Sequence, residues 1–526
     1  MRSKIYKFLF ITVLIASSIS CRKSAPLLNI TDTNETPPKE GTRAELTKDS
    51  LFLYAKQVYL WNESLPTYAV FNPRQYTNSS TDYDNFERVL FQITRYGINP
   101  LTGRPYEYNI DEPSQTKYSF IDDLVSNGTL SNLSSRKQSV DVKGKGNDIG
   151  YGLAVVGPKD NYALYIRYVS PGSPAEKAGL KRGNYFNQIN GKTFGTNYDG
   201  EINSLVDEVN KTTVTITGKK QNDIPFTVTL SEAIYNSSPI YKDSVYTIAG
   251  KKIGYLSYAR FSDTNNSIFR LDNTFANFAS TGVTDLVIDL RYNGGGYIST
   301  AEHLVNLIAP DRLNNLPMFS EYFNKTMQSG QADILRNQPD RDGNGNINFE
   351  NGKMVTLADY SYTPENNSSK IAKTGNLHNI ENVVFIISKN TASASELVIN
   401  SLKPYINVKT IGTTSYGKPV GFFPIRIGKY DVYYSMFSTK NSKGEGEYYA
   451  GMNPTNVIKD DPTKDFGDIT ETNLATAISL LTNGTVATTK TQTMMVKGKR
   501  VMSNDMIVTP IEDNSFKGMI EKRIRK

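Results

Sequence analysis

The sequence predicts a multidomain protein of mixed α/β (α+β) class, with a helical N-terminal region, a β-rich middle domain and an α/β core. Three observations support this prediction. The chain has 526 residues, which is too many for one ordinary hydrophobic core. Apolar residues recur at near-helical spacing before about residue 140, and short β-type runs follow. From about residue 235, apolar strand-like runs alternate with helical patterns, as in α/β domains.

The first 21 residues have the layout of a secretory signal peptide. Positive charges at residues 2–7 precede an apolar run at 8–16, small residues follow, and the only cysteine of the chain is Cys21. This arrangement resembles a bacterial lipoprotein processing site, although Ser18 and Ile19 depart from its usual pattern. We therefore expect lipidation at Cys21 and a membrane-anchored lipoprotein of the bacterial cell envelope, facing the periplasm or the cell surface. Plain secretion is the alternative.

The next segments are predicted as a tether and a helical region. Residues 22–43 are polar and contain Pro37-Pro38, which is typical of a linker. Residues 44–140 contain apolar and aromatic residues at helical spacing around residues 51–61 and 86–93, including the sole tryptophan, Trp61. The aromatic stripe fits a binding face or, more simply, core packing between short helices.

Residues 141–234 are predicted as a β-rich domain. The Pro171-Gly-Ser-Pro174 turn precedes a short helix that ends near Leu180, and the Asn190-Gly191 step favours a tight hairpin turn. These patterns resemble a PDZ domain of the bacterial protease type. The resemblance implies that a peptide tail adds to an edge strand and that a glycine-containing loop binds its carboxylate. The candidate substrate-binding residues are Gly150, Tyr151, Gly152 and Leu153.

Residues 235–483 show the α/β pattern most clearly. A buried strand at 285–290 runs into a glycine-rich end at 294–296, and a second apolar strand at 383–388 leads into an amphipathic helix at 394–402. Helices are also expected at 272–279 and 301–308. Residues 484–526 are a C-terminal tail with only short β-like pieces, and no function is assigned to them.

The most informative pair in the core is Ser393 and Lys418, which stand 25 positions apart. A serine is a poor nucleophile without a base, and a lysine in a water-poor site is one group that supplies it. The two histidines, His303 and His378, stand in no nucleophile-type motif, and the chain has no Gly-x-Ser-x-Gly elbow. The sequence therefore favours a Ser-Lys dyad over a Ser-His pair.

The surroundings of Ser393 fit an oxyanion hole. A serine at a strand-to-helix junction brings helix N–H groups to a developing anion, and Ala394 N–H is well placed to donate. A second donor is expected from the glycine-rich strand end, because glycine permits close backbone approach. To act as base, Lys418 needs a pKa lowered by burial to about 7. Tyr416, Val420 and Phe422 are the predicted walls. Taken singly, a helix cap, a glycine turn and a solvated lysine are each the simpler interpretation.

Together these features resemble the carboxy-terminal processing (tail-specific) serine proteases, over residues 141–425. That family carries an Asp-Leu-Arg-x-Asn-x-Gly-Gly strand end, a Ser-Ala-Ser-Glu motif and a Phe-Gly-Lys motif, found here at 289–296, 393–396 and, as Tyr-Gly-Lys, 416–418. The resemblance implies a core of the ClpP/crotonase-like type, Ser393 as nucleophile and Lys418 as general base. It also implies that Gly296 and Ala394 form the oxyanion hole. One departure is Phe422, which stands where many members place a glutamine that orients the lysine.

A second motif lies in the long insertion before Ser393. Residues 340–351 resemble the first half of an EF-hand calcium loop, with candidate ligands Asp340, Asp342, Asn344 and Asn346. The twelfth position is Asn351 instead of glutamate, so an Asx-rich surface turn is the simpler alternative, and no other cofactor is predicted. The net charge of +7 is small and scattered, which argues against nucleic acid as a partner.

The sequence thus predicts a serine endopeptidase that cleaves polypeptides, with the PDZ domain capturing substrate C-terminal tails and a lipid anchor holding the protein on a membrane. The alternative is a non-catalytic peptide- or ligand-binding lipoprotein on the same fold.

Overall fold

A computed structural model describes residues 36–124, 140–342, 345–485, 493–497, 499–502, 507–511 and 518–520. The predicted signal peptide and Cys21 lie outside these residues. Within the described ranges, no helix is both long and apolar enough to cross a membrane.

The N-terminal region is helical at its start and then becomes part of the core. Its main helices are α1 (Arg43–Val58), α2 (Tyr68–Phe71) and α3 (Asp82–Ile93). Helix α1 begins with a capping box in which the N–H of Glu45 donates to Thr42 Oγ1 and the N–H of Thr42 donates to the Glu45 carboxylate. The apolar faces of these helices pack into the same cluster as the α/β core. Strand β3 (Phe120–Asp123) also pairs with β24 (Tyr430–Tyr433) of the core, so the described part of the region is joined to the core and shares its hydrophobic clusters.

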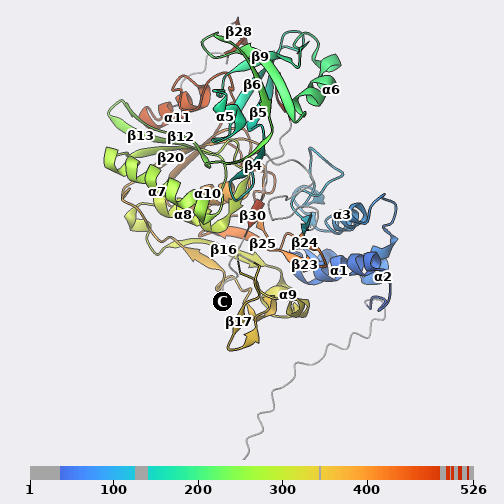
Figure 1. Cartoon of the computed structure of the whole chain (residues 1–526). Coiled ribbons are helices and arrows are strands. Elements are labelled where there is room, and N and C mark those ends of the chain that lie inside the picture. Colours follow the sequence, from blue (N-terminus) through green and yellow to red (C-terminus); the bar gives the residue numbers. More distant parts are fainter. Residues whose placement is uncertain are drawn as a thin grey trace, which may run out of the picture.

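The middle domain is an antiparallel sheet with strand order β10-β9-β7-β6-β5-β29, to which β8 adds. Its strands β5, β6 and β9 lie in the upper part of Figure 1. The bounds are β5 (Tyr151–Gly157), β6 (Ala163–Val169), α5 (Pro174–Lys177), β7 (Tyr185–Ile189), β8 (Lys192–Thr193), α6 (Tyr198–Val209), β9 (Thr213–Lys219) and β10 (Pro225–Ser231). The predicted hairpin turn joins β7 and β8, with left-handed φ values of 50° at Asn190 and 81° at Gly191. A two-stranded sheet of β4 (Lys145–Asp148) and β11 (Ala233–Asn236) connects this domain to the core.

The core is built on a six-stranded sheet of order β12-β13-β14-β20-β21-β26, which is parallel from β13 onward. Its strands are β12 (Ile240–Ile248), β13 (Lys251–Tyr258), β14 (Asp285–Asp289), β20 (Asn382–Ile387), β21 (Asn407–Gly412) and β26 (Asn456–Val457). Helices α7 (Thr264–Thr281), α8 (Ile298–Ile308) and α10 (Ala394–Leu402) pack on one face, and α11 (Thr472–Thr482) packs on the other. The predicted fold class is confirmed.

Smaller sheets and a long insertion flank this core. The insertion lies at the bottom of Figure 1, below the core sheet. The elements of these parts are β15 (Gly295–Tyr297), β16 (Pro317–Phe323), α9 (Lys325–Gln328), β17 (Phe349–Glu350), β18 (Lys353–Met354), β19 (Ser368–Lys370), β22 (Val420–Gly421), β23 (Ile425–Ile427) and β25 (Phe437–Asn441).

The C-terminal tail contributes strands to other parts of the molecule. Its strands are β27 (Thr493–Val496), β28 (Lys499–Met502), β29 (Ile507–Ile511) and β30 (Gly518–Ile520). Strand β29 extends the middle-domain sheet beside β5, and β30 pairs in parallel with β15 of the core. These pairings were not predicted, because strands of three to five residues carry too little pattern to identify a distant partner.

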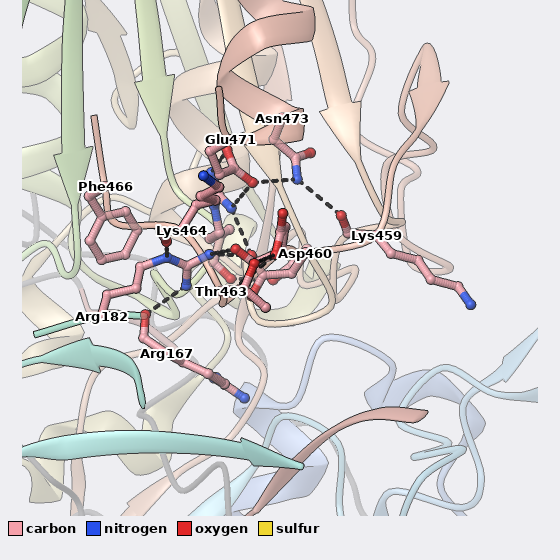
Figure 2. Close-up of polar contacts among 12 residues, drawn as sticks. Arg167, Arg182, Lys459, Asp460, Thr463, Lys464, Phe466, Glu471 and Asn473 are labelled. Atoms are coloured by element: carbon pink, nitrogen blue, oxygen red, sulfur yellow. Dashed lines mark hydrogen bonds and ion pairs between the residues drawn. The ribbon is translucent and has the colours of Figure 1, made fainter. Parts of the chain in front are cut away.

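The middle domain contacts the core through a network of buried charges (Figure 2). Arg182 of the middle domain donates to Asp460 Oδ1 at 2.7 Å and to the backbone carbonyls of Asp461 and Lys464. Arg291, at the end of β14, also donates to Asp460 and pairs with Glu471. The two cations pull the pKa of Asp460 well below its usual range, so it stays ionised although burial alone would raise that pKa. Arg291, a member of this network, belongs to the glycine-containing strand end that was predicted to supply an oxyanion donor.

Candidate active site

Ser393 lies at the predicted junction between a buried strand and a helix. Strand β20 ends at Ile387, and Ser393 directly precedes α10 with φ 61° and ψ −112°. A left-handed φ is unfavourable for any residue with a Cβ atom, so this position is strained. Ser393 is fully buried, and no described residue forms a hydrogen bond with its Oγ. The Ser393 hydroxyl is therefore not committed to a structural hydrogen bond within the described residues.

Lys418 lies in an apolar pocket, as its predicted role requires. The side chain is 1% exposed, and its Nζ lies 4.4 Å from the ring centroid of Phe422 and 5.7 Å from that of Tyr118. Burial lowers the pKa of Lys418 to about 7, although the carboxylates of Glu107 and Glu396 act in the opposite direction. Phe422, which replaces the expected glutamine, is therefore one wall of this pocket.

Glu396 connects the serine and lysine segments. Its Oε2 accepts hydrogen bonds from the backbone N–H groups of Ser393 and Lys418, each at 2.8 Å. Its Oε1 accepts from Gly417 N–H at 2.8 Å and from Ser415 Oγ at 2.5 Å. Burial raises the pKa of Glu396, and these donors oppose that rise. One carboxylate thus joins the start of α10 to the loop that carries Lys418.

The predicted oxyanion donors come from neighbouring backbone segments. A Cβ atom at Gly295 would lie 3.0 Å from the nitrogen of Ala394 and 2.5 Å from the carbonyl oxygen of Gly518, so only glycine permits this approach. Gly296 follows in β15, which is paired with β30 of the tail. The strand end and the start of α10 therefore lie together, and the oxyanion role of Gly296 and Ala394 stays a prediction.

The N-terminal region supplies three residues that sequence analysis missed. The hydroxyl of Tyr118 donates to the carbonyl of Gly417 at 2.5 Å, and Nζ of Lys117 donates to the carbonyl of Tyr449 at 2.8 Å. Burial lowers the pKa of Lys117 to about 8. The buried carboxylate of Glu107 accepts from the N–H groups of Tyr118 and Ser119. No motif marks these residues, because they reach the site only through tertiary packing.

The candidate peptide site of the middle domain is Gly150, Tyr151, Gly152 and Leu153. Gly150 has a left-handed φ of 85° and precedes β5 directly, as a glycine loop before an edge strand requires. The free edge of β5 is occupied by β29 of the same chain, with Ile511 opposite Leu153. The structure thus places a peptide strand at the predicted edge, and that strand is the tail of the protein itself.

The predicted calcium loop has a local hydrogen-bond pattern. Asp342 accepts from the backbone and the side chain of Asn346, and Asp340 accepts from Asn348 and Tyr360. The elements that follow are the short strands β17 and β18 rather than a helix. Asn344 lies outside the described residues, and calcium at this loop stays a prediction. Across the described ranges, no group of three or more His, Cys, Asp or Glu side chains is arranged to hold a metal ion.

Comparisons with known proteins agree with this architecture. Residues 252–447 match the model of peptidase family S41, and residues 165–218 match a PDZ domain model. The chain is 24% identical over 278 residues to a probable CtpA-like serine protease of Staphylococcus aureus (strain N315), covering 52% of this chain and 45% of that protein. It is 25% identical over 272 residues to the carboxy-terminal processing protease CtpA of Bacillus subtilis (strain 168), covering 50% and 46%. The chain thus spans about half the length of these curated relatives.

A solved structure has the same fold. A putative S41 protease from Bacteroides fragilis has a TM-score of 0.55 and 22% sequence identity, over 86% of this chain and 100% of that one. The fold and the matched domains define a peptidase-type core preceded by a PDZ domain. The core thus matches peptidase family S41, and the chain is similar to carboxy-terminal processing proteases of the CtpA type, the family that its motifs resemble.

Proposed function

We propose that this protein is a serine endopeptidase that cleaves polypeptides with Ser393 as nucleophile and Lys418 as general base. The observation that carries the proposal is the shared carboxylate of Glu396, which accepts from the backbone N–H groups of both residues at 2.8 Å. A second support is the pKa of about 7 for Lys418, because a base must be partly neutral at the working pH.

In the proposed reaction, Ser393 Oγ attacks the carbonyl carbon of the scissile peptide bond while Lys418 Nζ takes the Oγ proton. The N–H groups of Ala394 and Gly296 donate to the oxyanion, each donor lowering the barrier by about 3 kcal/mol. The tetrahedral intermediate collapses when the C–N bond breaks and Lys418 protonates the leaving amine. A water then attacks the Ser393 ester, with Lys418 again accepting and returning the proton.

The PDZ domain would deliver the substrate. A cavity between this domain and the core is lined by Tyr168 from β6, by Arg260 and by Gly294 and Gly295 next to the predicted oxyanion strand. This cavity brings the β6 side of the PDZ domain close to the strand end that holds Gly296, which supports delivery of a captured polypeptide to the core. The proposal includes lipidation at Cys21, which would hold the protein on a membrane. Calcium binding at residues 340–351 is a separate proposal.

The decisive experiment compares Ser393→Ala and Lys418→Ala on a denatured protein substrate. Both variants should lose cleavage, and undiminished cleavage by both would refute the dyad. Ser401→Ala is a matched control, because Ser401 is fully buried in the same helix and its Oγ also has no partner among the described residues. Lys373→Ala controls for loss of a lysine with a pKa lowered by burial, here to about 8.

The second candidate function is a non-catalytic binding protein. It is favoured by Phe422 in place of glutamine and by the pairing of the Gly296 strand with the tail. A serine-reactive fluorophosphonate separates the two functions. Labelling of the wild type but not of Ser393→Ala supports the peptidase, whereas a folded wild type that is never labelled supports the binding protein.

A further inference from the structure

The peptide unit between Gly417 and Lys418 is held at both of its polar ends. The hydroxyl of Tyr118 donates to the Gly417 carbonyl at 2.5 Å, and the Lys418 N–H donates to Glu396 at 2.8 Å. Because a peptide unit is planar, two hydrogen bonds at opposite ends fix the orientation of that plane. They therefore fix the point from which the Lys418 side chain leaves the backbone.

Tyr118 also borders the lysine side chain. Its ring centroid lies 5.7 Å from Lys418 Nζ, and Phe422 lies on the same ammonium group at 4.4 Å. Tyr118 is only 2% exposed, so its side chain helps to exclude water from the lysine pocket. A cation–π contact favours the charged lysine, but the loss of hydration outweighs it and lowers the pKa.

The backbone of Tyr118 is itself fixed by a buried acid. Glu107 accepts from the N–H of Tyr118 at 3.2 Å, and its other oxygen accepts from Ser435 Oγ of the core at 2.9 Å. The phenol is therefore held by the N-terminal region and docked on the core at a defined position.

We propose that Tyr118 is the positioning residue for the general base Lys418, a role that the family assigns to the glutamine replaced here by Phe422. The inference rests on the proposed function of Lys418. It makes the N-terminal region part of the catalytic machinery, since this region supplies the phenol.

The test uses Tyr118→Phe, which removes the hydroxyl and keeps the ring. Its kcat should fall at least about ten-fold with KM unchanged, because a displaced base slows chemistry without weakening substrate binding. The matched control is Tyr83→Phe, which removes a 2.8 Å hydrogen bond from another phenol of the same region to the Ile121 carbonyl. That control should keep the wild-type kcat.

A second variant tests the ring. In Tyr118→Leu, the rise of kcat/KM with pH should shift upward by about one pH unit, because water re-enters the pocket and restores the lysine charge. Wild-type kcat in Tyr118→Phe together with a wild-type pH profile in Tyr118→Leu would overturn the inference. If Lys418→Ala abolishes cleavage in that case, the proposed function stands; if Lys418→Ala retains cleavage, the proposed function itself fails.

A separate observation concerns the C-terminal tail. Strand β29 runs antiparallel to β5 from Ile507 opposite Gly157 to Ile511 opposite Leu153, so the tail proceeds toward the glycine loop. The Ile511 side chain is buried and packs in the same cluster as Leu153 of β5 and Leu205 of α6. This is the polarity and the pocket that a captured peptide end would use in edge-strand addition.

The same tail also pairs with strand β15 of the core. Gly518 N–H donates to the Gly294 carbonyl at 3.0 Å, and β30 pairs with β15, which contains Gly296. The geometry points to the tail as an internal ligand that an incoming polypeptide must displace from β5. The expected ligand is an extended peptide with an aliphatic residue at the Ile511 position. This inference deepens the proposed capture of substrate tails and rests on it.

The test is binding of a fluorescent peptide with the sequence of residues 507–511 and a free carboxylate to the full chain carrying Ser393→Ala, so that no cleavage intervenes. Adding Ile511→Asn should tighten peptide binding at least about ten-fold, because the competing strand loses its buried side chain. Adding Thr509→Asn, at an exposed position of the same strand, should leave the affinity unchanged. Equal affinity with and without Ile511→Asn, or no binding to any of the three proteins, would refute the inference and leave the Ser393 chemistry untouched.

Discussion

The backbone N–H groups of Ser393 and Lys418 donate to the same oxygen, Oε2 of Glu396, at 2.8 Å each. The proposed nucleophile and its proposed base are thus held by one buried acid on the first turn of α10. A carboxylate suits this position because it accepts four hydrogen bonds and offers no donor that would repel an N–H group.

Glu396→Gln tests that arrangement. The amide NH₂ of glutamine would face two donors, so we expect a loss of about 2–4 kcal/mol in the free energy of unfolding and a fall in cleavage rate of about a hundred-fold. Glu381→Gln, in an exposed ion pair with Arg312, is the control and should change stability by less than about 1 kcal/mol. Chemical denaturation and initial cleavage rates measure the two effects, and equal values for both variants would exclude the proposed role.

The proposed base predicts a pH dependence of activity. Lys418 must be neutral to accept a proton, and its pKa is about 7. The value of kcat/KM should therefore rise with pH and reach half its maximum near pH 7. A flat profile between pH 6 and 9 would contradict the assignment of Lys418 as the base.

The same lowered pKa predicts that Lys418 destabilises the fold. The unfolded lysine titrates near 10.5 and the folded one near 7, so the unfolded state binds more protons between these values and stability rises with pH across that window. Lys418→Met should raise the free energy of unfolding by about 2–5 kcal/mol at pH 6, with a gain that shrinks toward pH 10. Lys325→Met, at an exposed position, should give no such pH-dependent gain in urea unfolding.

The strained backbone at Ser393 predicts a difference between two inactive variants. Glycine tolerates the φ of 61°, whereas alanine retains the penalty of its Cβ atom. Ser393→Gly should therefore unfold with a free energy about 1 kcal/mol higher than Ser393→Ala. A Ser393→Ala variant that is the more stable of the two would show that this residue is not strained.

The buried Arg182 predicts strong coupling between the PDZ domain and the core. Arg182→Met leaves the carbonyls of Asp461 and Lys464 without their donor and should lower stability by about 3 kcal/mol. Lys159→Met, in an exposed pair with Asp199 of the same domain, should cost less than about 1 kcal/mol. Urea denaturation provides the comparison, and a similar cost for both variants would show that the network does not stabilise the docked domain.

Sequence alone predicted those parts of the site whose signals are local. The bounds of α10 were predicted without error, because Ser393 and Ala394 follow a continuous apolar strand and begin an amphipathic run. The pocket of Lys418 was only partly predicted. Phe422 is close in sequence and was named, whereas Tyr118 comes from the N-terminal region, which was predicted to be helical and was not connected with the site.

Other elements of the fold could not be predicted either, because local sequence patterns do not encode them. Helix α7 begins at Thr264, eight residues before its expected start, because Asp263 caps it while its first turn is polar and shows no apolar periodicity. Strands β29 and β30 depend on pairing with β5 and β15, which no short segment encodes by itself.

The hydrogen bond between Tyr118 and Gly417 joins residues that are 299 positions apart. Contacts between such distant segments form late in folding, since the loop between them must first be closed at a cost in entropy. The core sheet, and the PDZ-domain sheet apart from β29, can form from nearer segments. We therefore expect the lysine pocket to be completed only after most of the chain has folded, so that a nascent or partly folded chain would lack the proposed peptidase activity while it is still itself a potential substrate.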